Sequence, residues 1–140
     1  MPKRRAIITD DDAYLMRRVK AKLEPSESQS QRALIKWWSH ACRGFGLHEK
    51  TLMAFPMQGA RTPRNGARMK AEGMRAGLPD CLVAVARSNY HGLWIENKTS
   101  KGQLSESQQE MRDILIKQGY AWFLCRSLDE AINTITTYLS

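Results

Sequence analysis

Two acidic residues and one lysine are spaced along the chain as a metal-assisted hydrolytic site would require. Asp80 follows the dipeptide Leu78-Pro79, and Glu96 and Lys98 lie two positions apart in an apolar segment. Side chains alternate between the faces of a strand, so Glu96 and Lys98 point the same way. A residue before proline is pushed into an extended conformation, which places Asp80 at the start of a strand. Two neighbouring strands would therefore bring Asp80 beside Glu96.

These residue types suit hydrolysis of a phosphodiester. Negative charge shields the phosphorus atom and the alkoxide leaves poorly, and a divalent cation on the phosphate eases both problems. Mg²⁺ prefers oxygen ligands and keeps several waters, so a few protein oxygens suffice. The Lys98 ammonium would orient the attacking water and offset charge on the phosphate, whereas a general-base role is less secure because an ordinary lysine stays protonated near neutral pH. We expect a Mg²⁺ site that also accepts Mn²⁺.

The ordinary alternative is a Glu96–Lys98 ion pair on an exposed strand and a simple turn at Asp80. The segment from Gly73 to Asp80 and the downstream pair Ser105 and Gln108 argue against it. A basic stretch also precedes Asp80. From Gly59 to Gly77 the chain has one acid and five basic residues, which are Arg61, Arg64, Arg68, Lys70 and Arg75. We interpret this glycine-punctuated stretch as a loop that follows DNA phosphates, with a merely solvated loop as the alternative.

Length, charge and cysteine content narrow the class of protein. The 140 residues make one compact domain, and the net charge of +8 favours a polyanionic partner. The cysteines are odd in number and far apart, which excludes a disulfide framework and indicates a reducing, cytoplasmic setting. No run of eighteen apolar residues and no signal peptide occur, so no membrane association is expected.

The predicted elements follow the order helix, three strands, helix, strand, helix after a short N-terminal helix. Capping boxes are expected at Ser26 with Gln29 and at Ser105 with Gln108. The predicted strands are 51–55, 81–86, 93–98 and 120–125, and the last helix starts at Ser127. Glu27 extends an apolar stripe of the first core helix at helical spacing, so its side chain is expected to face the core or a cleft.

Four segments resemble the virus-type replication-repair nuclease (VRR-Nuc) family of the PD-(D/E)XK superfamily, and in particular its stand-alone phage and prophage members. They are GMRAGLPD at 73–80, HGLWIENK at 91–98, LSESQ at 104–108 and QGYA at 118–121. With Glu27 and Gln31 upstream, the resemblance covers about residues 26 to 139. Asn97 departs from the family pattern, because a hydrophobic residue would be the simple choice between Glu96 and Lys98. An exposed strand end is the expected explanation.

The resemblance implies an α/β fold with an αβββαβ core and a mixed sheet flanked by helices. Residues 26–140 would form the nuclease domain and 1–25 a helical appendage. The implied metal ligands are Asp80, Glu96 and the main-chain carbonyl of Asn97, with Glu27 acting directly or through water. Lys98 and Gln108 complete the implied catalytic set, while Lys101 and Ser105 join the basic stretch in contacting DNA.

The function that follows is a metal-dependent, structure-selective endodeoxyribonuclease. The resemblance implies cleavage of branched DNA, Holliday junctions in particular, by a homodimer with two active sites. An amphipathic face at Leu15, Met16, Val19 and Leu23 is expected to contribute to the dimer interface. A nicking, flap or linear-duplex nuclease is the alternative enzyme, and a non-catalytic nucleic-acid-binding module is the alternative from another class. The latter gains nothing from acids in its groove unless a cation intervenes.

Overall fold

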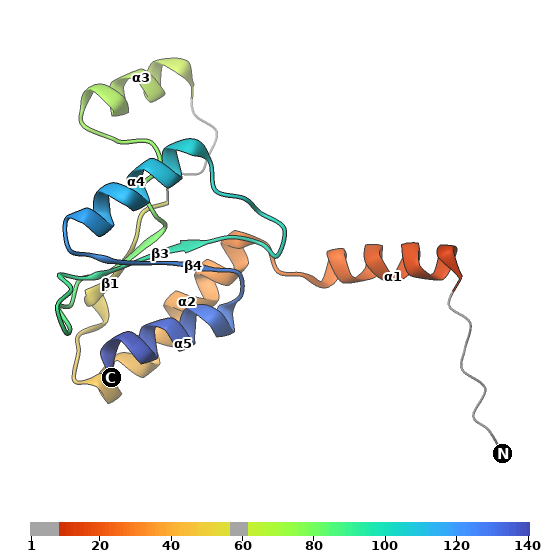
Figure 1. Cartoon of the computed structure of the whole chain (residues 1–140), viewed down its shortest axis with the longest axis horizontal. Coiled ribbons are helices and arrows are strands. Elements are labelled where there is room, and N and C mark those ends of the chain that lie inside the picture. Colours follow the sequence, from red (N-terminus) through yellow and green to blue (C-terminus); the bar gives the residue numbers. More distant parts are fainter. Residues whose placement is uncertain (1–8, 57–61) are drawn as a thin grey trace.

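A four-stranded mixed sheet forms the centre of the computed structural model, which describes residues 9–56 and 62–140 (Figure 1). The strands are β1 (Leu52–Ala54), β2 (Cys81–Val83), β3 (Leu93–Asn97) and β4 (Ala121–Cys125), in that order across the sheet. β1, β2 and β3 pair antiparallel, and β4 joins β3 in parallel. The chain therefore needs a crossover between β3 and β4, which the helix after Ser105 supplies.

Helices cover both faces of the sheet (Figure 1). α2 (Glu27–Ala41) and α5 (Leu128–Leu139) lie on one face, and α4 (Glu106–Lys117) lies on the other. Two short 3₁₀ helices, Cys42–Phe45 and Glu49–Thr51, connect α2 to β1. The largest fully buried side chains lie on the α2–α5 side or in the strands and include Leu34, Trp38, Leu93, Ile95 and Ile135. This core fixes the ends of β2 and β3, where the predicted carboxylates lie.

The predicted α/β class and the αβββαβ order are confirmed. Both predicted capping boxes are present, with Ser26 accepting from the Gln29 amide and Ser105 from the Gln108 amide. In each box the glutamine side chain accepts in return from the serine amide. Local sequence alone set these two helix starts, because each box satisfies donors that a helix N-terminus leaves free.

Part of the basic stretch before Asp80 is a helix, so the predicted loop was wrong for residues 63–71, whereas Arg75 lies in the irregular backbone that follows. α3 (Pro63–Ala71) begins at Thr62, whose hydroxyl accepts from the Asn65 amide, and Pro63 occupies its first turn. Proline with its fixed φ suits this position. Gly66, which reads as part of a turn, costs about 1 kcal/mol relative to alanine within a helix and is tolerated there. Arg64, Arg68 and Lys70 are therefore carried on a helix; Arg61 lies outside the described residues.

The N-terminal appendage is the helix α1 (Asp10–Leu23), which extends away from the body of the fold (Figure 1). The apolar side chains that the sequence places on one face are exposed, from 56% at Val19 to 77% at Leu23. The chain after α1 is tied to the body by Glu24, whose carboxylate accepts from the amide and the hydroxyl of Ser100. Among the described residues, no helix is long and apolar enough to cross a membrane.

Candidate active site

Asp80 and Glu96 lie side by side, at the start of β2 and near the end of β3 respectively. The register pairs Cys81 with Ile95, so one residue further along Asp80 lies opposite Glu96. Residues directly opposite on one face have Cβ atoms about 5 Å apart. The Asn97 amide donates to Oδ2 of Asp80 at 2.7 Å, and Gln108 Nε2 of α4 donates to Oε1 of Glu96 at 2.9 Å. The structure thus brings the two predicted carboxylates together on the α4 face.

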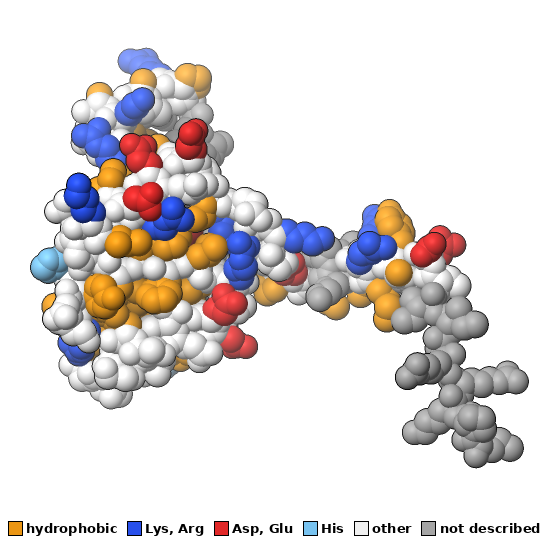
Figure 2. Space-filling view, in the orientation of Figure 1, with side chains coloured by type: hydrophobic (Ala, Val, Ile, Leu, Met, Phe, Trp, Pro, Cys, Tyr) orange, Lys and Arg blue, Asp and Glu red, His pale blue; other side chains and the backbone are white. Residues whose placement is uncertain are grey.

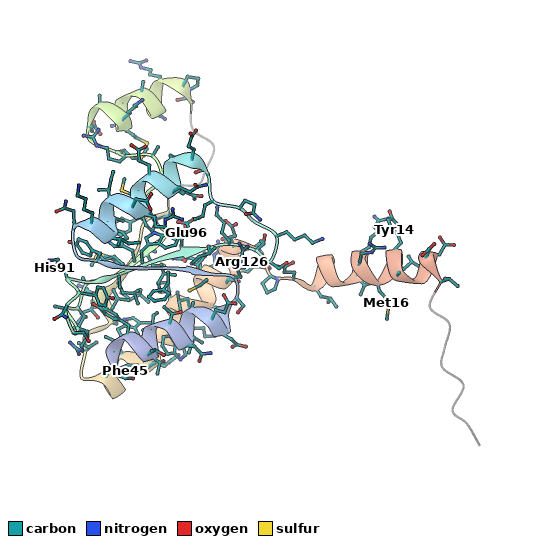
Figure 3. All side chains as sticks on the ribbon, in the orientation of Figure 1. Tyr14, Met16, Phe45, His91, Glu96 and Arg126 are labelled. Carbon is teal, nitrogen blue, oxygen red and sulfur yellow. The ribbon has the colours of Figure 1, made fainter. Side chains whose placement is uncertain are left out.

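Lys98 completes the group without lying on an exposed strand. Its Nζ is 3.7 Å from Oε1 of Glu96, and the two side chains are only 14% and 4% exposed. Every residue of β3 is buried. A solvated ion pair on an outer strand, the ordinary alternative from sequence, does not describe this environment. Figure 3 shows Glu96 between the sheet and α4.

The charges and the burial of Asp80 and Glu96 favour a bound cation beside them. Burial, and then the neighbouring Asp80 carboxylate, raise the pKa of Glu96 to about 8, while Lys98 opposes the rise. Burial also raises the pKa of Asp80, against the hydrogen bond from the Asn97 amide. Two desolvated carboxylates that repel each other are stabilised in their charged form by a positive ion between or beside them.

The oxygen atoms present fit a hard divalent cation. In a strand the N–H and C=O of one residue point to the same side, so the Asn97 carbonyl opens toward Asp80 as its amide does. Mg²⁺ is commonly held by one or two carboxylates and completes its shell with water. No group of three or more acidic, histidine or cysteine side chains gathers at metal-binding distance in the described residues. Glu27 lines a hollow with Asp80, which fits a water-mediated role.

Asn97 is buried at 6% exposure, so the expectation of an exposed strand end was wrong. Its Nδ2 donates to Oε1 of Gln31 at 2.6 Å, and Gln31 Nε2 donates to Sγ of Cys81 at 2.9 Å. Burial raises the pKa of the Cys81 thiol to about 12, which keeps this partner neutral. A buried amide is tolerated when it is hydrogen-bonded, and Gln31 provides that bond. The sequence signal for Gln31 was its place four residues after Glu27 on the inward stripe, whereas Cys81 carried none.

Gln108 caps α4 through its Oε1, which accepts from the Ser105 amide, and binds the Glu96 carboxylate through its Nε2. The segment leading to Asp80 runs directly against the start of this helix. Gly77 has a φ of +82°, and a Cβ there would collide with the carbonyl of Ser107. Only glycine fits both this backbone conformation and this close approach. The glycine before Leu78-Pro79-Asp80 therefore sets how closely α4 and the carboxylates approach each other.

A cleft of about 450 Å³ opens above Asp80 and Glu96. Lys70 and Arg75 line it on one side, and the start of α4 lines it on the other through Ser105, Ser107 and Gln108. Arg64 and Arg68 are exposed on α3 outside this lining, and Lys101 is exposed on the turn after β3. Figure 2 shows basic side chains gathered over α3. The floor of the cleft is thus acidic and one wall is basic.

Comparisons with known proteins agree with this architecture. The family model described as the VRR-NUC domain matches residues 25–129. A solved structure named "VRR_NUC domain protein" is similar with a TM-score of 0.71 and 26% sequence identity, over 84% of this chain and 92% of the other. None of the curated proteins matches the chain significantly. The family match over most of the sequence shows that the chain belongs to the VRR-NUC domain family, a membership that suggests a nuclease of the PD-(D/E)XK type.

Proposed function

We propose that the protein is a divalent-metal-dependent endodeoxyribonuclease that hydrolyses phosphodiester bonds in branched DNA. The observation that carries this proposal is the pair of carboxylates, the half-buried Asp80 and the buried Glu96, with the Lys98 ammonium beside Glu96 in a cleft that Lys70 and Arg75 also line. A protein that only binds DNA gains nothing from two acids facing the phosphates, unless a cation lies between them.

Asp80, Glu96 and the Asn97 carbonyl are the groups that would hold Mg²⁺ or Mn²⁺, with Glu27 acting through water. When bound there, such an ion would supply Lewis-acid activation of the phosphate and would lower the pKa of the attacking water. Lys98 orients that water and balances charge that develops on the phosphate. Gln108 holds the Glu96 carboxylate in place through the bond from its Nε2.

The basic residues provide the path of the DNA backbone. Lys70 and Arg75 line the cleft and contact phosphates next to the scissile bond. Arg64 and Arg68 on α3, Lys101 on the turn after β3 and Ser105 at the start of α4 provide further contacts. Arg61, which lies outside the described residues, is proposed as a contact from the sequence alone. Such contacts are independent of sequence, which suits an enzyme that selects DNA by its shape.

We propose further that residues 26–140 form the nuclease domain and that the active form is a homodimer acting on four-way junctions. Paired cuts on opposite strands need two sites at a fixed separation, and each chain provides one. The exposed apolar stripe of α1 supports this assembly, because a second copy would cover side chains that its own chain leaves in water.

The proposed activity is tested by incubating the purified protein with a four-way junction, a flap, a nicked duplex and a linear duplex, each with Mg²⁺, Mn²⁺ or EDTA. We expect paired incisions in the junction with either metal and none in EDTA. Preferential cleavage of the flap or the nicked duplex would support the alternative nuclease instead. Binding of all four substrates without cleavage would indicate a binding module, and undiminished cleavage in EDTA would exclude the metal.

The assembly is tested by light scattering on the wild type and on a Leu15→Asp, Val19→Asp variant. We expect a mass of about twice the 16.0 kDa of one chain for the wild type and a shift toward one chain for the variant. The variant should then make single nicks where the wild type makes paired cuts. A variant that stays dimeric would reject α1 as the interface but not the dimer, and a wild-type monomer that makes paired cuts would reject the dimer.

A further inference from the structure

One guanidinium nitrogen of Arg126 donates to several main-chain carbonyls of the turn 99–102, which follows Lys98. Nη1 of Arg126 donates to the carbonyls of Thr99 at 2.9 Å, Ser100 at 3.4 Å and Gly102 at 2.7 Å. The turn is closed by the Gly102 amide, which donates to the Thr99 carbonyl at 3.2 Å. Three carbonyls of one turn thus point to a single side chain.

The parallel pairing of β3 and β4 places Arg126 next to this turn. Asn97 is in register with Cys125, and the Lys98 amide donates to the Cys125 carbonyl at 2.9 Å. Arg126 follows Cys125 directly, so it stands beside Lys98 where the two strands end. Figure 3 shows Arg126 at the end of the sheet from which the turn leaves.

The same turn is held from its other side by the segment after α1. Glu24 accepts from the Ser100 amide at 2.7 Å and from the Ser100 hydroxyl at 3.0 Å. Hydrogen bonds in which one partner is ionised are the stronger class, and the turn has such bonds to a cation and to an anion. Its position is therefore set by side chains far from it in sequence.

The turn 99–102 restricts the side chain of Lys98. A Cβ built on Gly102 would lie 3.2 Å from Cδ and 3.4 Å from Cβ of Lys98, so the backbone of Gly102 packs directly against the lysine stem. At the end of this stem, Nζ lies 3.7 Å from Oε1 of Glu96. A lysine has four rotatable bonds, and packing of its stem removes the freedom that would let the ammonium leave the site.

We propose that Arg126 is a positioning residue for Lys98: it holds the turn 99–102 against the lysine stem and so keeps the ammonium beside the carboxylates. The inference rests on the proposed function, since Lys98 matters for cleavage only if the site is a nuclease site. A phosphate contact is the competing role for an arginine near DNA. The two roles differ in what lysine can replace, because an ammonium can contact a phosphate, whereas a lysine side chain ends one bond short of the position of Nη1, the atom that reaches all three carbonyls of this turn.

The kinetic test compares Arg126→Lys with Arg43→Lys, a matched change at an exposed arginine of the first 3₁₀ helix. For Arg126→Lys we expect kcat on the branched substrate to fall by about 10- to 100-fold, because a displacement of about 1 Å in a catalytic group has effects of that size. KM and DNA binding should stay within about twofold of the wild type, and Arg43→Lys should change neither constant. Full activity of Arg126→Lys, or a loss confined to KM, would overturn the positioning role.

Gly102→Ala provides a second variant if changes at Arg126 impair folding. The added methyl group presses on the lysine stem and removes no hydrogen-bond donor or acceptor of the turn. We expect a smaller loss in kcat, about 3- to 10-fold, with KM unchanged. Wild-type kcat in this variant would show that the turn does not govern Lys98.

An NMR measurement decides the positioning without relying on cleavage. In protein labelled with ¹³C-lysine, the Lys98 side-chain signals, assigned by their loss in Lys98→Ala, should be distinct in the wild type. They should move toward the values of an unstructured lysine in Arg126→Lys. Unchanged Lys98 signals would overturn the inference even if cleavage were reduced. If the wild type cleaves no DNA, the proposed function fails, while the NMR result still shows whether Arg126 holds Lys98.

Discussion

The side chains of Glu96 and Lys98 are 4% and 14% exposed, whereas the apolar side chains along one face of α1 are more than half exposed. The charged groups lie inside the fold and several apolar groups lie outside it, which is the reverse of the usual distribution. Burying a charge costs free energy that only a partner recovers. This contrast motivates the two proposals, a bound cation in the inner region at Asp80 and Glu96 and a second copy of the chain on the apolar face of α1.

Replacement of Glu96 by glutamine tests the inner region most directly. Glutamine keeps the shape and an acceptor for Gln108 but removes the metal-binding charge, so we expect at least about a 1000-fold loss in kcat. The metal-free variant should be more stable than the wild type at pH 8, because a buried carboxylate has been removed. Thermal unfolding and single-turnover cleavage measure the two effects.

Asp129→Asn on α5 is the matched control, since this acid is exposed and far from the cleft. It should leave both kcat and stability near the wild-type values. A Glu96→Gln variant that cleaves normally would remove this residue from the mechanism, and one that is much less stable would contradict the cost assigned to the buried charge.

The pH dependence of the free energy of unfolding is a second test of the cost of burying Glu96. The pKa of Glu96 is about 8 in the folded chain, against an ordinary value of 4.5. Between these values the folded chain keeps a proton that the unfolded chain has released, so the free energy of unfolding of the metal-free protein falls as the pH rises. The slope approaches about 1.4 kcal/mol per pH unit for one proton.

Mg²⁺ should reverse this loss at pH 8, because the ion favours the ionised carboxylates. At one hundred times its dissociation constant a ligand of the folded state adds about 2.7 kcal/mol. Thermal unfolding from pH 4.5 to 8, with and without Mg²⁺, measures both effects. Stability that rises with pH in the absence of metal would contradict the electrostatics of the site.

The hydrogen bonds beneath the carboxylates provide the next test. Gln31→Leu leaves the buried side-chain amide of Asn97 without its acceptor, which should cost about 1–3 kcal/mol of stability. It should also lower kcat, because a shift of Asn97 displaces the main-chain N–H that donates to Asp80. The double variant Gln31→Leu, Asn97→Leu removes both partners and should recover much of the stability. Urea unfolding of Gln31→Leu, Asn97→Leu and the double variant measures the difference. A double variant as unstable as the sum of the single ones would contradict the pairing.

Removal of basic side chains should have smaller effects on cleavage, and these effects should differ between residues that line the cleft and residues outside it. Lys70→Ala with Arg75→Ala removes two charges that line the cleft, and Arg64→Ala with Arg68→Ala removes two that lie outside it. Both pairs should reduce the log–log salt slope of DNA binding by about 0.9 per lost phosphate contact. Only the inner pair should also reduce kcat. An unchanged slope in both would show that α3 does not contact DNA.

The sequence by itself determined the order of elements and the residue types at the site. Capping boxes, strand-length apolar runs and the spacing of Asp80, Glu96 and Lys98 are local patterns, and local patterns follow from backbone hydrogen bonding and side-chain periodicity. The helix at 63–71 was missed although Thr62 and Pro63 signal its start, because Asn65-Gly66 favours a turn and the stretch carries no apolar stripe.

The tertiary structure alone decided how those residues are held. Three features depend on contacts between segments far apart in the chain. The buried Asn97 side chain donates to Gln31, Gly77 packs against Ser107, and Arg126 donates to the carbonyls of the turn after Lys98. Such contacts leave no periodic trace in a single sequence. They arise because a buried polar group must find a partner, and only the packed fold determines which partner is within reach.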